Sequence, residues 1–442
     1  MAPTISFGIE LEFLIEVEHQ RDSTTVGPLS KTIPIPPELS IYSSRARQEA
    51  AHHVGRTVSE TISRNVVVCN VFDQSKAEDF TMWTVAQDYS VMPPSGIRGH
   101  WISVELISPA FLSNDVSSFS QIVKVVKSLA TSYNIHLNPS CGFHVHCGLG
   151  LRKEDRMPLW LLKRLGMLFW AVDPVLSRLH PPERLINPSL AGIRLDSRLA
   201  SAAGMPSTQK VLDEISEDIY MQPEAHDWKA GQDQEYGLRY LARQGAYTPA
   251  GIQQRQSLAA QEDRREHLEK AWRLPWADNA ALRRHSSVHG DYPIPQRAPS
   301  IRNASAPPLR ELLYCSCKPH VGALLSSPGM WRPNYSFGNY RLDRSRQPES
   351  RKPTIEFRQA GGTMDARWIV IWTKICIALM EYARNSTMEE LMELLNKLEQ
   401  REVGDYGTSC SVAELLRAIG KGGLADAVKQ RFEDVGRKGW YY

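Results

Sequence analysis

Hydrophobic and polar residues alternate along the stretch FGIELEFLIEV, Phe7 to Val17, close to the start of the sequence. Six apolar residues occupy every second position, and Glu10, Glu12 and Glu16 lie between them. A period of two predicts a β-strand over residues 6–17, because successive strand side chains point to opposite faces of a sheet. One face of this strand is therefore apolar, while the other places two carboxylates about 7 Å apart.

The same analysis predicts a series of strands and helices along both ends of the chain. Strands are expected at 65–72, 82–88, 101–111, 141–150 and 353–361. Helices are expected at 45–64, 115–133, 155–180, 365–384, 387–400 and 411–433. Strand-rich and helical segments in this order are typical of an α+β fold with a mainly antiparallel sheet.

The middle of the chain, residues 181–351, differs in kind. Arg, Gln, Pro and Ser are abundant there, and hydrophobic periodicity is weak outside short pieces such as KVLDEISEDIY. Proline- and serine-rich segments without periodicity are typical of loops. We therefore expect residues 1–180 and 352–442 to form a single domain, and residues 181–351 to be a partly irregular insertion that caps it.

Composition excludes several classes of protein. The 442 residues are 42% hydrophobic and 23% charged, which is ordinary for a globular protein. The net charge of +3 is too small to indicate a nucleic-acid partner. The sequence shows neither a membrane-spanning apolar run nor a secretory signal, and its seven scattered cysteines are expected to be free thiols. These features favour a cytoplasmic protein without a membrane or nucleic-acid partner, and they are compatible with an oligomer.

Ionisable residues recur on the second face of four predicted strands. His144 and His146 share a strand face in GFHVHCG, and Glu356 and Arg358 share one in TIEFRQAG. Glu105 lies between two apolar residues in SVELISP. Taken singly, each pattern has a structural explanation: a buried histidine, a cross-strand ion pair or a solvated acid.

Together, the four strands predict a metal centre if they are neighbours in one curved sheet. Carboxylates that lie close together repel one another unless cations neutralise them. Oxygen-rich sites suit Mg²⁺ or Mn²⁺, and a histidine is acceptable to Mn²⁺. Arg358 would then bind phosphate or carboxylate oxygens. The residues expected to converge are Glu10, Glu12, Glu105, His144, His146, Glu356 and Arg358.

The ordered set FGIELEFLI, WTVAQDYS, VELISPAF, NPSCGFHVHCGLG and IEFRQAGGTMD resembles the amidoligase family. That family is part of the carboxylate–amine ligase superfamily, which includes glutamine synthetase and glutamate–cysteine ligase. The resemblance covers residues 5–180 and 352–385. It implies an antiparallel sheet curved into a funnel with helices on its outer face. It also implies ATP-dependent formation of an amide bond between a carboxylate, activated as an acyl phosphate, and an amine.

The resemblance also implies a role for each matched residue. Glu10, Glu12, Glu105, His144 and Glu356 match metal ligands, which would hold two or more Mg²⁺ or Mn²⁺ ions. His146 and Arg358 match residues beside the transferred phosphate of ATP. Asp88 matches a position associated with substrate recognition, where it would hold or deprotonate the amine. Tyr89 departs from the small residue that usually follows this aspartate, and the long insertion is a second departure.

Two other functions compete with the ligase. A metal-dependent hydrolase would use the His-x-His and carboxylate residues, but would need a third nitrogen ligand or a compact zinc set. A catalytically silent nucleotide-binding protein would keep the funnel without turnover. The chain has no Gly-x-x-x-x-Gly-Lys-Ser/Thr loop, so ATP would have to bind through metal ions. The expected substrates are an amine and a carboxylate on amino acids, small peptides or related metabolites.

Overall fold

The computed structural model describes residues 3–19, 31–69, 80–93, 96–152, 154–181, 184, 192–197, 199, 228–243, 306–326, 333–340, 354–403, 411–438 and 440. The chain divides into two compact units, each built from separate stretches of sequence. Unit 1 comprises Met1–Arg152, Ala360–Ile377 and Gln430–Tyr442, and unit 2 comprises Lys153–Gln359 and Ala378–Lys429. The fold is mixed α/β, and its strand pairings are mostly antiparallel.

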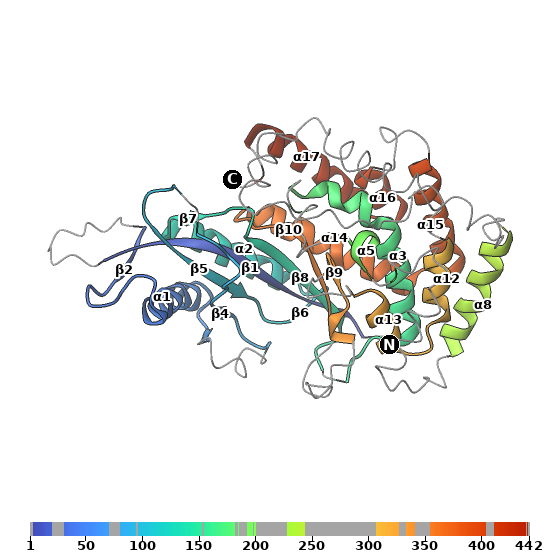
Figure 1. Ribbon diagram of the computed structural model, residues 1–442, viewed down its shortest axis with the longest axis horizontal. Coiled ribbons are helices and arrows are strands. Elements are labelled where there is room, and N and C mark those ends of the chain that lie inside the picture. The colour runs from blue at the N-terminus through green and yellow to red at the C-terminus, as the bar shows by residue number, and fades with distance from the viewer. Residues whose placement is uncertain are drawn as a thin grey trace. The chain divides into compact units, whose positions relative to one another are not determined.

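The sheet of unit 1 is organised around one long strand, β1 (Ile5–His19), which crosses the whole unit (Figure 1). The strands follow the order β3-β4-β5-β1-β8, so β1 has β5 on one side and β8 on the other. The short strands β2, β6 and β7 also pair with β1, and β1–β2 and β3–β4 are parallel. Their bounds are β2 (Ile33–Ile35), β3 (Val67–Val68), β4 (Thr84–Ala86), β5 (His100–Ile107), β6 (Phe111–Leu112), β7 (Ile135–His136) and β8 (Gly142–Leu149).

The apolar face of β1 forms the core of unit 1. Ile9, Leu11 and Phe13 are fully buried, as the alternation predicted. Phe7 stacks on Phe119 of α2 (Val116–Ser132), with ring centroids 5.0 Å apart, so α2 lies on this face. Helix α1 (Ser44–Ile62) packs against α2. Ser43 caps its N-terminus, where the Ser43 side chain accepts a hydrogen bond from the Ala46 amide.

Unit 2 is built around α3 (Leu159–Leu176), nearly all of whose side chains are buried. A helix that is buried all round needs neighbours on every side. These neighbours are α8 (Trp228–Arg243), α12 (Ala306–Tyr314), α13 (Lys318–Leu324) and α15 (Met388–Val403). Three of the four lie within residues 181–351, where the sequence analysis expected a partly irregular cap. That this segment caps the site remains a prediction.

Buried charged groups join the helices of unit 2. Arg164 of α3 makes a two-pronged ion pair with Asp233 of α8, at 2.6 and 2.7 Å, and also donates to the Ser386 carbonyl. Lys163 donates to the Leu313 carbonyl of α12 at 2.8 Å. Burying a charged group between helices is costly unless it is hydrogen-bonded, and each of these two cations has a buried acceptor.

The C-terminal segment differs from its prediction as one helix over 411–433. It forms two helices, α16 (Val412–Ala418) and α17 (Gly422–Lys438), separated by Gly420. Gly420 has φ +76°, a left-handed conformation that favours glycine and ends a helix. The preceding helix, α14 (Ala366–Asn385), agrees with the predicted range.

Two further expectations concern membranes and cysteines. Within the described part of the chain, no helix has the length and apolar character needed to cross a membrane. The cysteines that the structure describes are all free, which confirms the expectation for them. Cys410 lies outside the described residues.

A buried aspartate in unit 2 predicts a pH dependence of stability. Asp173 of α3 accepts hydrogen bonds from the side chains of Asn334 and Ser177. Burial raises the pKa of this carboxyl to about 6, although Asn334 and the charge of Arg194 act in the opposite direction. Since the folded pKa exceeds the unfolded value of about 3.9, the protonated acid stabilises the fold below about pH 4, and this stabilisation is lost as pH rises through 6.

We expect Asp173→Asn to remove this loss, because asparagine keeps an acceptor oxygen but never ionises. The melting temperature of the variant should rise relative to wild type as pH increases from 5 to 7. Thermal unfolding at several pH values in one buffer series measures this difference. If the melting temperatures of the two proteins change by the same amount between pH 5 and 7, Asp173 does not titrate as described.

Candidate active site

Strand register brings the predicted acids and histidines of unit 1 together. β1 pairs with both of its neighbours in antiparallel fashion, and Glu12 lies directly opposite Glu105 of β5. On the other side of β1, Glu10 lies directly opposite His144 of β8. Directly paired residues in neighbouring strands have side chains on the same face. The alternation predicted which face each residue occupies, and the register explains why they meet.

Three carboxylates converge at this face, and we call them the three-acid cluster: Glu12, Asp88 and Glu105. One carboxylate oxygen from each lies within 4.8 Å of the others. Asp88 joins the cluster because β4 pairs with β5 and places Ala86 opposite Glu105, two residues before Asp88. Carboxylates at this spacing repel one another in the absence of a cation. The arrangement therefore has the donor set that a hard divalent cation prefers.

Glu12 is the most enclosed member of the three-acid cluster. The residue is 6% exposed, and its Oε2 accepts a 2.6 Å hydrogen bond from the backbone amide of Gly142, at the start of β8. Its Oε1 lies 3.6 Å from Nδ1 of His144. One oxygen is thus held by the backbone of β8, which orients the other toward the histidine and the remaining acids.

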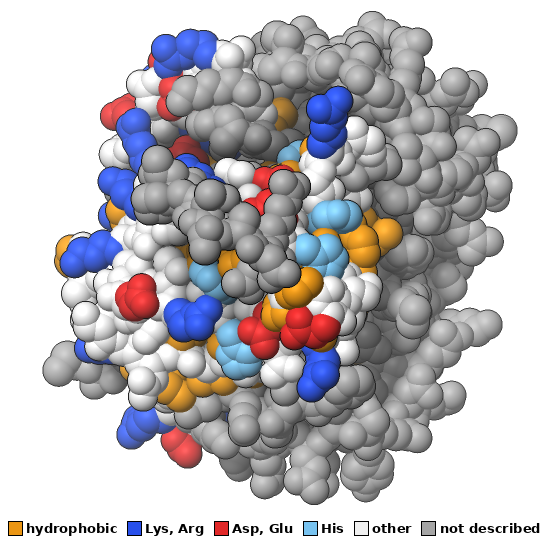
Figure 2. Space-filling model, turned by 90° about the vertical axis from the view of Figure 1, so that its left-hand side faces the viewer, with side chains coloured by type: hydrophobic (Ala, Val, Ile, Leu, Met, Phe, Trp, Pro, Cys, Tyr) orange, Lys and Arg blue, Asp and Glu red, His pale blue; other side chains and the backbone are white. Residues whose placement is uncertain are grey.

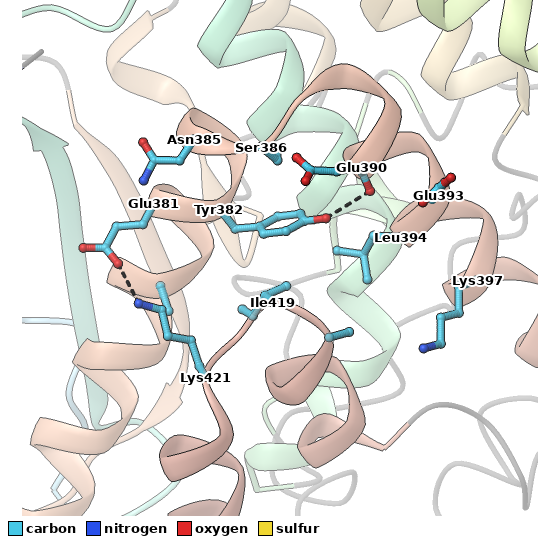
Figure 3. Close-up of a pocket in the computed structure, with 12 residues that line it drawn as sticks. Glu381, Tyr382, Asn385, Ser386, Glu390, Glu393, Leu394, Lys397, Ile419 and Lys421 are labelled. Atoms are coloured by element: carbon cyan, nitrogen blue, oxygen red, sulfur yellow. Dashed lines mark hydrogen bonds and ion pairs between the residues drawn. The ribbon is translucent and has the colours of Figure 1, made fainter.

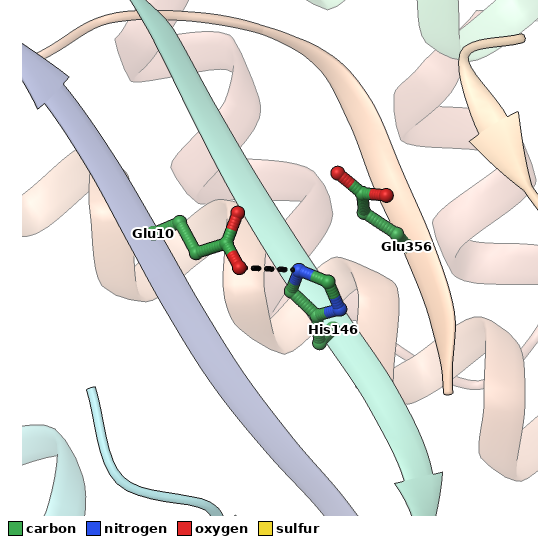
Figure 4. Close-up of side chains that lie close together, drawn as sticks. All are labelled: Glu10, His146 and Glu356. Atoms are coloured by element: carbon green, nitrogen blue, oxygen red, sulfur yellow. Dashed lines mark ion pairs between the residues drawn. The ribbon is translucent and has the colours of Figure 1, made fainter. Parts of the chain in front are cut away.

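Glu10 and the two histidines form a second group beside the cluster. Figure 4 shows the ion pair between Glu10 and His146. His146 Nε2 lies 2.9 Å from Glu10 Oε1, and His144 Nδ1 lies 3.3 Å from Glu10 Oε2. Burial alone would raise the pKa of Glu10, but the charge of His146 and hydrogen bonds from both histidines lower it well below its usual value. Glu10 is therefore ionised at neutral pH, as a carboxylate metal ligand must be.

The remaining two predicted residues lie in unit 2, on β10 (Ile355–Gly361). Glu356 and Arg358 form an ion pair and share a strand face, as their spacing predicted. Their side chains are 11% and 13% exposed. Phe357, between them, packs on Phe169 of α3 with ring centroids 5.1 Å apart. The grouping of Glu356 and Arg358 with the residues of unit 1 remains a prediction.

The backbone of β10 is held by residues that the sequence analysis did not identify. β10 pairs with β9 (Tyr335–Ser336), and the Arg358 amide donates to the Asn334 carbonyl at 2.8 Å. The buried guanidinium of Arg184 donates to the Arg358 carbonyl at 2.9 Å. Arg184 and Asn334 lie in the segment of weak periodicity and far in sequence from β10, so no local pattern connects them with it.

The geometry does not favour the zinc hydrolase. The three-acid cluster offers oxygen ligands only, without the nitrogen or sulfur ligands that zinc usually takes. The donor chemistry therefore fits Mg²⁺ or Mn²⁺ better than zinc.

Unit 2 also contains a pocket of about 570 Å³ between α14, α15 and α16 (Figure 3). Lys421 forms an ion pair with Glu381 at 2.9 Å, and the Tyr382 hydroxyl donates to the Glu390 carbonyl at 3.0 Å. None of the predicted site residues lines this pocket. The Glu390 carboxylate also accepts a hydrogen bond from the Thr387 amide, so Glu381 and Glu390 are engaged in local contacts, and we assign the pocket no role in the chemistry.

A comparison with known families identifies the chain. Residues 3–226 match the model of the family described as "Putative amidoligase enzyme". This match contains the three-acid cluster, Glu10 and both histidines, and it extends past residue 180, the end of the first stretch of the resemblance. Residues 352–385, the second stretch of the resemblance, lie outside the match. Searches of curated proteins and of solved structures found no match. Because the family model covers half of the chain, the protein belongs to the amidoligase family.

Proposed function

We propose that the protein is an ATP- and Mg²⁺- or Mn²⁺-dependent ligase that joins a carboxylate to an amine through an acyl phosphate. The observation that carries this proposal is the three-acid cluster, in which like charges from β1, β5 and the loop after β4 lie within 4.8 Å. Cations relieve the repulsion in such a cluster: divalent ions at Glu12 and Glu105, and the ammonium group of the substrate at Asp88. Mg²⁺ typically links protein carboxylates to the phosphates of a substrate. Membership of the amidoligase family supports a ligase rather than another phosphate-using enzyme.

The proposed roles come from the resemblance to the family and agree with the donor chemistry of each residue. Glu10, Glu12, Glu105, His144 and Glu356 would hold divalent ions, which neutralise the triphosphate and lower the barrier to phosphoryl transfer. We further propose that the sheet curves into a funnel like that of glutamine synthetase, which would bring β10 to the same site.

The other residues act on the reacting groups. A free carboxylate does not react with an amine at neutral pH, because oxide is a poor leaving group. Transfer of the γ-phosphoryl group to the carboxylate converts this oxygen into phosphate, a good leaving group. We propose that Arg358 and His146 bind the phosphate oxygens. Asp88 would hold the amine and accept its proton.

A substrate screen tests the proposal. Purified protein is incubated with ATP, Mg²⁺ and pairs of carboxylates and amines, and ADP, phosphate and amide are measured. We expect ADP and amide in equal amounts, only when both substrates are present, and no product after addition of EDTA. Release of AMP and pyrophosphate would contradict the phosphoryl-transfer mechanism. Hydrolysis of an amide without ATP would favour the metallohydrolase, and nucleotide binding without any turnover would favour the silent protein.

A further inference from the structure

The loop after β4, residues 87–92, crosses the sheet of unit 1 on the face that carries the three-acid cluster, and we call it the strap. It begins where β4 lies beside β5, and it reaches the loop between β7 and β8 on the other side of β1. In between, Val91 is buried against Leu14, which lies two residues after Glu12 and on the same face of β1. The strap carries Asp88 in its second position, so the place of this carboxylate depends on the strap.

Two hydrogen bonds fasten the far end of the strap to the loop between β7 and β8. The Met92 carbonyl accepts from Nδ2 of Asn138, and the Met92 amide donates to Ser140 Oγ, both at 2.9 Å. The Ser140 hydroxyl in turn donates to Asn138 Oδ1 at 2.6 Å, which leaves lone pairs of its oxygen for the Met92 amide. Asn138 therefore holds the strap directly through its amide group and indirectly through Ser140.

Glu12 is held from the same loop, but by backbone groups alone. The Gly142 amide donates to the Glu12 carboxylate at 2.6 Å. The residue before it is fixed at both ends, because the Cys141 amide donates to the Asn138 carbonyl at 2.9 Å and the Cys141 carbonyl accepts from the Gly362 amide at 2.8 Å. Loss of the Asn138 side chain leaves these backbone bonds available, so Glu12 keeps its support while the strap loses its own.

An acid that contacts a substrate needs firmer support than an acid on an open surface. Figure 2 shows charged side chains spread over one face of the molecule. Where such charges are exposed, water screens them and their exact position matters little. Asp88 instead lies in a cluster with Glu12 and Glu105, and a shift of about 1 Å in a reacting group can lower a rate about 100-fold.

We propose that Asn138 is a positioning residue, which fixes the strap and so holds Asp88 where the amine substrate binds. The inference rests on the proposed ligase function, in which Asp88 binds the amine and Glu12 binds a divalent ion. Since Glu12 has its own backbone support, loss of the Asn138 side chain should disturb the amine site and leave the metal site intact. A residue that only stabilised the fold would not separate the two.

Amine kinetics and Mn²⁺ binding test this inference on Asn138→Ala. With the amine and carboxylate that give the most amide, we expect kcat/KM for the amine to fall about tenfold, as is typical when a residue that orients a site group is lost. Mn²⁺ affinity should equal that of wild type. Ser140→Ala removes only the acceptor of the Met92 amide, so it should give a smaller fall in the same direction, and it serves as the test if Asn138→Ala does not fold.

Asn134→Ala is the matched control. Asn134 precedes the same loop and donates a 2.7 Å hydrogen bond to Glu16, which is not part of the three-acid cluster. Its loss removes a side-chain hydrogen bond of similar length without any contact with the strap. We therefore expect kcat/KM and Mn²⁺ affinity equal to those of wild type.

Hydrogen exchange of the ligand-free protein separates this inference from the proposed function. Mass spectrometry measures amide exchange over residues 87–92, which we expect to be faster in Asn138→Ala than in wild type and Asn134→Ala. Unchanged exchange there, an unchanged kcat/KM for the amine, or a loss of Mn²⁺ affinity as large as the loss of turnover would each overturn the inference. If exchange rises as expected but wild type makes no amide with any substrate pair, the ligase function fails while the link between Asn138 and the strap stands.

Discussion

Glu12→Gln is expected to lower ligase turnover by on the order of 100-fold or more, with a folded protein. Glu12 contributes one oxygen to the three-acid cluster. Loss of a residue that only orients a metal ligand typically lowers metal affinity about 10–100-fold, so loss of a ligand itself should cost at least as much. The fold should survive, because glutamine keeps an acceptor for the Gly142 amide. ADP release and Mn²⁺ binding on the same preparation measure the effect.

Glu16→Gln is the matched control for this variant. Glu16 lies on the same strand and the same face as Glu12, but its Oε2 accepts a 2.7 Å hydrogen bond from Asn134 and it is not part of the cluster. We expect its turnover and Mn²⁺ affinity to equal those of wild type. Melting temperatures add a second readout, since a ligand stabilises the state that binds it. Mg²⁺ should stabilise wild type and Glu16→Gln but have little effect on Glu12→Gln; equal stabilisation of all three would remove Glu12 from the metal site.

Arg358→Lys is the second substitution for which we expect a large effect, a loss of turnover of about 10²–10³-fold, as is typical when a charge-stabilising donor is lost. Arginine binds two phosphate oxygens at once with a planar fork of donors, whereas lysine is a point charge. The strand should remain in place, because Asn334 and Arg184 bind the backbone of Arg358, which the substitution leaves unchanged. The melting temperature should therefore change little, and nucleotide and metal should still bind.

Arg164→Lys is the control for an arginine with a purely structural role. Arg164 makes a buried ion pair with Asp233 and has no predicted contact with substrates. Disruption of such a pair is costly to stability, so we expect a lower melting temperature with normal turnover of the folded protein. If Arg358→Lys behaves in the same way, Arg358 only balances the charge of Glu356. Normal turnover in a stable Arg358→Lys protein would likewise exclude it from catalysis.

Periodicity alone predicted, for most side chains of β1, which face of the sheet they occupy. The positions of Glu10 and Glu12 opposite a buried apolar row followed from a period of two, which does not depend on which strands are neighbours. Leu14 departs from the alternation, because it shares the face of Glu12 yet is buried under Val91 and Cys141. A local pattern cannot show that a loop distant in sequence covers one end of a polar face.

The composition of the three-acid cluster was less predictable. Glu105 by itself has the pattern of a solvated acid, and only the register of β5 on β1 places it opposite Glu12. Asp88 was assigned to the amine from a resemblance, whereas the structure groups it with two acids that were assigned to metal. Register depends on turn geometry and on pairing across long sequence separations, which a single sequence does not encode locally.

The central claim is that a carboxylate is activated as an acyl phosphate, and transfer of an oxygen isotope tests it most directly. The carboxylate identified in the substrate screen is labelled with ¹⁸O and incubated with ATP, Mg²⁺, the amine and the protein. Mass spectrometry then measures the label in the released phosphate. We predict one ¹⁸O atom in phosphate for each amide formed, because the phosphoryl group leaves with a carboxylate oxygen. Amide formation with unlabelled phosphate, or with the label in AMP, would contradict the account.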